Sequence, residues 1–306
     1  MRWALRLLAP ILLIGLCFWV LGTAEIGARL VAAKPIWIGA SVAALFLQTI
    51  LMALRWRLVA CCLGAEMSFG WALREYLAGQ LLNATLPGGV IGDAARAVRA
   101  RIGRSGLRRA TQAVVIERMA GQVGLALVAG VGLAATLAIP GGFVPPPFLT
   151  LIMVIILAML TGSLLAATQL ERSAALIRRC LPTLRVTAIQ TTISVAAALL
   201  NVAAFAACAR ATGTVLGIGA ALVLIPVILT AMLIPLSVGG WGWREGAAAA
   251  LFPIGGADPA AGVAAGIAFG TAILLSTLPA GAFALSGRPK QGVRPIEGDA
   301  APKGTG

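Results

Sequence analysis

Histidine is absent from this chain of 306 residues, and acidic residues are few, with ten Asp and Glu against 24 Lys and Arg. The lack of histidine removes the commonest general base and the commonest transition-metal ligand, which excludes His-based catalytic triads and typical zinc sites. The five cysteines lie in or beside apolar runs without redox or metal-ligand spacing, so we interpret them as small packing residues. No Gly-x-x-x-x-Gly-Lys-Ser/Thr motif occurs. We therefore expect no cofactor and no metal.

Charge is scarce overall, since 11% of the residues are charged and 60% are hydrophobic, with a mean hydropathy of +0.98. A soluble globular protein has roughly 25% charged residues. Apolar runs of about 18 or more residues recur along the chain, as in helices that cross a membrane. The runs do not alternate with a period of two, which excludes a transmembrane β-barrel. The sequence predicts an all-α, polytopic integral membrane bundle of about seven or eight spans.

The formal net charge of +14 raises the question of a nucleic-acid partner. The arginines, however, lie in the connections between apolar runs, as positive-inside topology requires. No soluble module with a basic face is present, so we exclude nucleic acid as a partner. The charge pattern instead predicts a multi-pass membrane protein with a cytoplasmic N-terminus.

The apolar runs define the expected spans. The first run resembles a signal peptide, but it is about long enough to cross a membrane and no cleavage site precedes Glu25, so a retained helix is predicted. We expect spans at Leu7–Ala24, Ile36–Leu54, Val114–Ile139, Phe148–Thr168, Thr187–Ala209, Val215–Pro235 and Ala261–Leu285.

Two regions result from this division: a transmembrane domain over residues 1–286 and a disordered basic tail over 287–306. Seven full spans would place the tail outside, although it contains Arg288, Lys290, Arg294 and Lys303. Either a later break in the chain adds a crossing or the tail disobeys the charge bias. We favour a tail on the inside.

The segment Leu81–Arg99 interrupts an apolar run with polar and glycine residues. Pro87 ends a preceding helix, and the glycines allow tight turns. Basic residues on both flanks favour a re-entrant hairpin over a full crossing. Asp93, Arg96 and Arg99 then follow at helical spacing, next to a helix N-terminus suited to anions. The predicted phosphate-binding residues of this first break are Asn83, Gly88, Gly89, Gly92, Asp93, Arg96 and Arg99.

Several alternatives stay open for the first break. Asp93 either caps the helix or pairs with Arg96. The arginines that follow are interpreted as topology signals: Arg101, Arg104, Arg108 and Arg109. Glu117 and Arg118, near the start of the next span, either form ion pairs with Asp93 or Arg96 or contact substrate directly. They lie about 100° apart on a helix, so each is expected to meet a different partner.

A second break follows at Ile234–Gly246, where glycines again loosen the chain before an alanine-rich helical run. Trp241 and Trp243 lie in this break, and tryptophan commonly anchors a membrane protein at the membrane–water interface. Paired broken segments in two halves of a transporter indicate a central binding site. The predicted site residues of the second break are Ser237, Gly239, Gly240, Arg244 and Glu245.

These motifs together resemble the lysylphosphatidylglycerol synthase transmembrane, or flippase-like, family over roughly residues 5–285: Asn83 through Leu86-Pro-Gly-Gly, Gly92-Asp93, Arg96, Glu117-Arg118 and Pro235 through Gly246. The resemblance implies a bacterial or archaeal inner-membrane protein, and in the best-understood members this region is associated with moving an aminoacylated phospholipid between leaflets. It also implies that Asp93, Arg96, Glu117, Arg244 and Glu245 occupy characteristic family positions. The two-part members carry a soluble synthase domain after the membrane part, and this chain has only a short tail there. Aminoacyl transfer is therefore not expected.

The first function hypothesis is a lipid translocase, or a component of one, for an anionic or aminoacylated phospholipid or a polyprenyl-phosphate lipid. The second is a membrane-embedded enzyme that modifies a lipid headgroup with Asp93 or Glu117 as the general base, although no convincing nucleophile supports it. The third is a non-catalytic accessory subunit of a lipid or glycan synthesis system. The expected partners are membrane lipids with a phosphate headgroup, and a homo-oligomer or a separately encoded synthase is compatible with the sequence.

Overall fold

The computed structural model describes residues 2–101, 106–139, 143–169, 171–234, 237–281 and 293–295. The fold is all-α, as predicted, with one pair of very short strands. The elements in chain order are α1 (Arg2–Leu21), α2 (Thr23–Val31), α3 (Pro35–Cys62), β1 (Ala65–Met67), α4 (Phe69–Thr85), α5 (Ile91–Arg99), α6 (Gly106–Ala138), α7 (Pro147–Gln169), α8 (Glu171–Cys180), α9 (Leu184–Ala211), α10 (Ile218–Ala231), α11 (Trp243–Leu251), the 3-10 helix η1 (Phe252–Gly255), α12 (Pro259–Ser276) and β2 (Val293–Pro295).

The long apolar helices correspond to predicted spans. Within the described residues, four helical stretches are long and apolar enough to cross a membrane: Pro35–Cys62, Gly106–Ala138, Leu184–Ala211 and Pro259–Gly281. The bent pair formed by α1 and α2 would make a fifth. The structure thus confirms a polytopic helical protein, whereas the predicted number of seven or eight spans is not confirmed.

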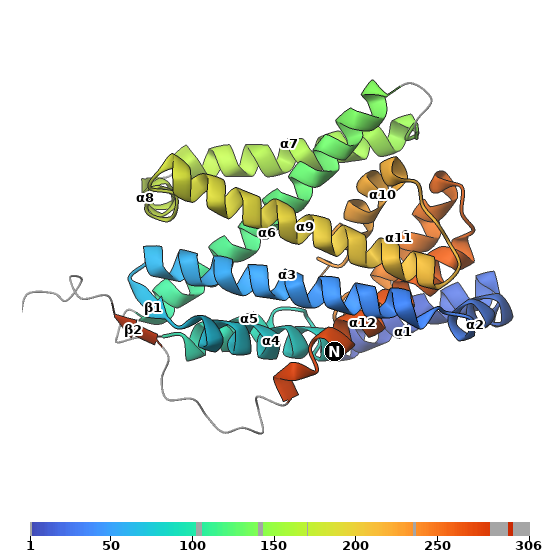
Figure 1. Ribbon diagram of the computed structural model, residues 1–306, viewed down its shortest axis with the longest axis horizontal. Helices are drawn as coiled ribbons and strands as arrows, with labels where there is room; N and C mark the ends of the chain where they lie inside the picture. Colours follow the sequence, from blue (N-terminus) through green and yellow to red (C-terminus); the bar gives the residue numbers. More distant parts are fainter. Residues whose placement is uncertain are drawn as a thin grey trace, which may run out of the picture.

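Helices α3 and α9 run antiparallel side by side (Figure 1). The Lys34 N–H at the start of α3 donates to the Ala211 carbonyl at the end of α9, over 3.0 Å. Small residues bring helix α6 against the same pair. A Cβ at Gly124 of α6 would lie 2.5 Å from the Ser194 carbonyl oxygen of α9, so glycine is needed for this approach.

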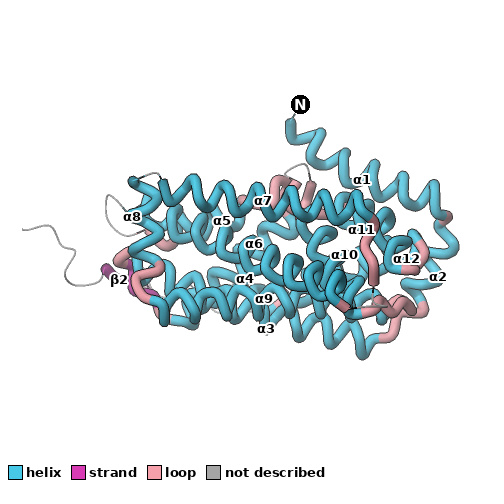
Figure 2. Tube along the Cα trace, turned by 90° about the horizontal axis from the view of Figure 1, so that it is seen from above, coloured by secondary structure: helices cyan, strands magenta, loops and turns pink. Residues whose placement is uncertain are grey.

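Each helix of this pair begins a series of three helices, and the two series have the same order. A 28-residue helix, a shorter helix, a glycine turn and a nine-residue helix occur in α3–α4–α5, and again in α9–α10–α11. Figures 1 and 2 place α4 and α5 at one end of the molecule and α10 to α12 at the other. Because α3 and α9 are antiparallel, the two hairpins enter from opposite ends and meet in the middle.

Two predicted spans differ from the structure. The run Leu7–Ala24 is not one straight helix, because α1 ends at Leu21, Gly22 has a φ of 83°, and α2 turns away by 99°. The run Val215–Pro235 contains only the 14 residues of α10, about 21 Å of helix against a hydrocarbon core of about 30 Å. The second break is therefore a hairpin that extends partway, like the first. Pro235 itself lies outside the described residues.

The C-terminal tail is described only at Val293–Pro295, which forms β2 and pairs antiparallel with β1. β1 lies in the connection between α3 and α4. The predicted disorder of the rest of 287–306 falls outside the described residues.

Candidate functional site

The two breaks are in direct contact, although about 150 residues separate them in the chain. The Gly88 N–H donates to the Ser237 carbonyl oxygen over 3.0 Å, and Pro87 and Val238 form an antiparallel bridge. Glycines with positive φ make both turns possible, at 98° for Gly88 and 82° for Gly240. The breaks predicted separately from the sequence thus form one junction at the centre of the bundle.

Within the first hairpin, α4 and α5 approach closely at Gly92. A Cβ at Gly92 would lie 1.9 Å from the Gly79 carbonyl oxygen of α4. The Gly92 N–H donates to the Asn83 side-chain oxygen over 2.7 Å. This corrects part of the predicted anion site: the amides of Gly88 and Gly92 are engaged by Ser237 and Asn83, so neither is available for a phosphate.

Asp93, the third residue of α5, links the two arginines nearest the break. One carboxylate oxygen accepts from Arg96 over 2.5 Å, and the other forms an ion pair with Arg118 of α6. The Asn83 side-chain amide donates to Asp93 over 3.2 Å. Of the two predicted roles for Asp93, pairing with Arg96 is the one observed. Arg118 also donates to the Gly89 carbonyl oxygen over 3.1 Å, which ties α6 to the turn.

Glu117 lies behind this cluster and is completely buried. It accepts from Arg55 of α3 over 2.7 Å and from the Tyr76 hydroxyl over 3.2 Å, and it lies 3.5 Å from Arg96. Arg55 in turn donates to the Ser194 hydroxyl of α9 over 2.8 Å. As predicted from their positions on the helix, Glu117 and Arg118 meet different partners. Together they connect α6 to α3, α4 and α5, through the buried Glu117 and the half-buried Arg118.

Arg96 is 2% exposed and is held between aromatic rings. Its guanidinium carbon lies 4.1 Å from the Tyr76 ring centroid and 4.8 Å from that of Trp56. Cation–π contacts of this kind fix the plane of a guanidinium in a desolvated site. Its Nη1 atom has no hydrogen-bond partner among the described residues. An oriented cation with a free donor group therefore remains in the site.

The second break holds a comparable pair. Glu245, the third residue of α11, accepts from the Gly242 N–H over 2.6 Å and from Arg244 over 2.5 Å. Both side chains are completely buried. The Arg244 guanidinium lies over Trp241, with 4.8 Å from its central carbon to the ring centroid. Trp241 therefore packs against the buried pair instead of acting only as an interface anchor.

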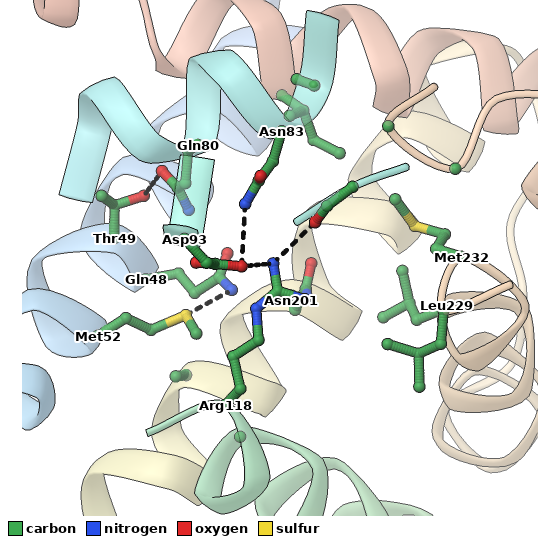
Figure 3. A pocket seen from close by; sticks show the side chains of 18 of the residues that line it. Gln48, Thr49, Met52, Gln80, Asn83, Asp93, Arg118, Asn201, Leu229 and Met232 are labelled. Atoms are coloured by element: carbon green, nitrogen blue, oxygen red, sulfur yellow. Dashed lines mark hydrogen bonds and ion pairs between the residues drawn. The ribbon is translucent and has the colours of Figure 1, made fainter. Parts of the chain in front are cut away.

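A cavity of about 350 Å³ opens at the junction of the two breaks. Figure 3 shows its polar side facing an apolar side formed in part by Leu229 and Met232 of the α10 region. The polar side includes Gln48, Thr49, Gln80, Asn83, Asp93, Arg118 and Asn201. The predicted site residues that line the cavity are Asn83, Gly88, Gly89, Asp93, Arg96, Arg118, Ser237, Gly239 and Gly240.

Five predicted site residues do not line the cavity: Gly92, Arg99, Glu117, Arg244 and Glu245. Gly92 packs against α4, and Glu117 lies in the layer behind the cavity. The Arg99 side chain is 40% exposed and pairs with Glu75 of α4 away from the cavity. Arg244 and Glu245 pair with each other inside the second hairpin.

Sequence reasoning missed several cavity residues. Arg55 is one of the basic residues that flank the first break in the sequence, and its position there does not reveal that it turns inward to Glu117. Single amides within apolar spans were a usable signal, since polar side chains at membrane depth usually face the bundle interior. The missed amide residues are Gln48 in α3, Gln80 in α4, Gln122 in α6 and Asn201 in α9.

Comparison with known protein families identifies the family of the chain. Among curated proteins, no sequence matches the chain. A family model described as the lysylphosphatidylglycerol synthase TM region matches residues 4–281, which include both hairpins and every residue that lines the cavity. The protein is therefore an integral membrane protein that belongs to the lysylphosphatidylglycerol synthase transmembrane-region family.

Proposed function

We propose that this protein is a lipid translocase, or the membrane component of one, that moves an anionic lipid between the leaflets of a bacterial inner membrane. The observation that carries the proposal is the cavity at the junction of the two hairpins, because it joins a polar, arginine-containing side to an apolar side. A lipid has the same two-part character: a charged headgroup attached to apolar chains.

The charge of the site favours an anionic headgroup. Arg55, Arg96 and Arg118 carry three positive charges, and Asp93 and Glu117 carry two negative charges, which leaves one net positive charge. Such a charge in a low-dielectric site attracts an anion strongly. Arg96 lines the cavity, and its buried Nη1 has no hydrogen-bond partner among the described residues.

The position of the cavity suits passage between leaflets. Helix α3 is 28 residues long, about 42 Å, and Gln48 and Thr49 on the cavity wall lie at its midpoint. The hairpins reach this point from opposite ends of the α3–α9 pair. Movement of one hairpin away from the other would therefore open the same cavity toward one leaflet or the other, as in transporters with broken helices at the midplane.

Transport fits the cavity better than catalysis does. The Ser237 hydroxyl donates to the Ile234 carbonyl oxygen and accepts from the Gly240 N–H. The Ser194 hydroxyl accepts from Arg55 and donates to a backbone carbonyl. Neither is bonded to a carboxylate that could activate it as a nucleophile. We therefore propose that the protein acts without covalent chemistry on the lipid.

Purified protein in vesicles with a trace of phosphatidylglycerol labelled on an acyl chain tests the proposal. Dithionite bleaches label in the outer leaflet only, so translocation lowers the protected half of the fluorescence. We expect the unaltered protein to lower the protected fraction of the fluorescence. The variant Asn201→Phe, whose larger side chain fills the cavity from α9, should leave this fraction at about half.

The matched control is Leu199→Phe on the same helix, where the side chain is 44% exposed on the outer surface. It should transport at the unaltered rate. Equal rates for both variants, or no translocation by the unaltered protein, would contradict the proposal.

A further inference from the structure

Two amide side chains, Gln48 of α3 and Asn201 of α9, face each other at the middle of the α3–α9 pair. Each belongs to one of the two helix series that have the same order. Along the antiparallel α3–α9 pair, Ser41 contacts Cys208 and Arg55 contacts Ser194. Gln48 is seven residues from both Ser41 and Arg55, and Asn201 is seven residues from both Cys208 and Ser194. Seven residues are close to two helical turns, so Gln48 and Asn201 lie opposite each other on the same faces. Both line the cavity (Figure 3).

These amides retain hydrogen-bonding capacity. Within the described part of the chain, the side chains of Asn201 and Gln122 have no hydrogen-bond partner, and both line the cavity. Gln48 donates only to the Met52 sulfur, over 3.3 Å, which is a weak acceptor. An amide carries both donors and an acceptor, so a cluster of them matches hydroxyl groups, which also donate and accept.

The charged groups of the cavity disfavour a cationic headgroup. Asp93 is the carboxylate that lines it, and both of its oxygens are engaged by Arg96 and Arg118. An ammonium group that entered would meet these arginines without a free carboxylate to pair with. Like charges repel, so a lysyl-bearing headgroup is a poor match.

We infer, on the basis of the proposed lipid-binding function, that the lipid carries one phosphodiester linked to a neutral, hydroxyl-rich group such as glycerol, inositol or a sugar. The phosphate binds at Arg96 and Arg118. The hydroxyls bind between Gln48 and Asn201. Because these two amides come from the two different helix series, they contact the headgroup whichever leaflet the cavity faces.

Binding to the purified full chain in detergent tests this independently of movement. The lipids are phosphatidylglycerol, phosphatidylinositol, phosphatidylpropanol and lysylphosphatidylglycerol, each titrated while the unfolding temperature is recorded. Phosphatidylpropanol has the same phosphodiester without hydroxyls. We expect it, and the cationic lysyl lipid, to bind about tenfold or more weakly than phosphatidylglycerol. Phosphatidylinositol should bind at least as tightly as phosphatidylglycerol.

The variant Gln48→Leu/Asn201→Leu separates a specificity role from a structural one. It should reduce the affinity for phosphatidylglycerol to that for phosphatidylpropanol, and leave phosphatidylpropanol binding unchanged. The inference would be overturned if the unaltered chain bound phosphatidylglycerol and phosphatidylpropanol equally. It would also be overturned if lysylphosphatidylglycerol bound more tightly than phosphatidylglycerol. Selective binding without movement in vesicles would uphold this headgroup class and refute translocation, so the two failures are distinguishable.

Discussion

Arg96 and Arg118 share one carboxylate, Asp93, and this sharing shapes the chemistry of the cavity. A buried charge is costly unless it is paired, and each arginine here has at least one carboxylate within ion-pair distance. The sequence offered the pairing of Asp93 with Arg96 as one of two roles, because three residues separate them on one helix. For Glu117 and Arg118 it left two roles open, ion pairs with Asp93 or Arg96 and direct contact with substrate. It did not predict Arg55 as the main partner of Glu117, since that contact depends on how α3 packs against α6.

At the residue scale, Glu117→Gln should destabilise the protein strongly. The substitution leaves the buried Arg55 without its carboxylate partner, and breaking such a pair costs about 3–5 kcal/mol. Thermal unfolding in detergent measures the loss. The control is Glu25→Gln, where the carboxylate is 51% exposed and pairs with Arg29, and where about 0–1 kcal/mol is expected. If both variants lost the same thermal stability, the contacts of Glu117 with Arg55, Tyr76 and Arg96 would not be what holds these helices together.

At the scale of elements, the nine-residue helices α5 and α11 are the distinctive parts of the fold. Each follows a glycine turn and has a carboxylate at its third residue paired with a buried arginine. The sequence predicted both breaks, because proline and glycine interrupt helices locally. It could not predict that the breaks meet, since the contact of Gly88 with Ser237 joins distant segments. It also predicted one full span where α10 extends only partway.

The closeness of α4 and α5 gives a prediction for Gly92→Ala. A methyl group there would lie 1.9 Å from the Gly79 carbonyl oxygen, so the hairpin has to spread, at a cost of about 1–3 kcal/mol or more. Gly246→Ala in α11 is the matched control, because its added Cβ meets nothing within 4 Å and alanine favours a helix. Unfolding temperatures of the two variants give the comparison. An unchanged value for Gly92→Ala would refute the tight packing of this hairpin.

At the scale of the whole molecule, the second hairpin changes the topology inferred from seven spans, in which the first break was already re-entrant. We propose that neither hairpin changes the side of the chain and that α1, α3, α6, α7, α9 and α12 each cross once, which brings the tail back to the side of the N-terminus. The pairing of β2 with β1, in the α3–α4 connection next to Arg57, agrees with a tail on the arginine-rich side. The charge bias then holds throughout.

Reporter fusions test this topology. Green fluorescent protein matures in the cytoplasm and alkaline phosphatase is active outside it, so each fused after residue 306 reports the side of the tail. We expect fluorescence without phosphatase activity, and the reverse pattern for fusions in the connection between α6 and α7. An active phosphatase at the C-terminus would mean that one hairpin crosses the membrane completely.

The most direct measurement for the central claim is an experimental structure of the protein with phosphatidylglycerol, determined in a lipid nanodisc. The account predicts lipid density in the cavity, with the phosphate at hydrogen-bond distance from Arg96 or Arg118 and the glycerol between Gln48 and Asn201. An empty cavity at saturating lipid, with phosphates only on the outer surface of the helices, would contradict it.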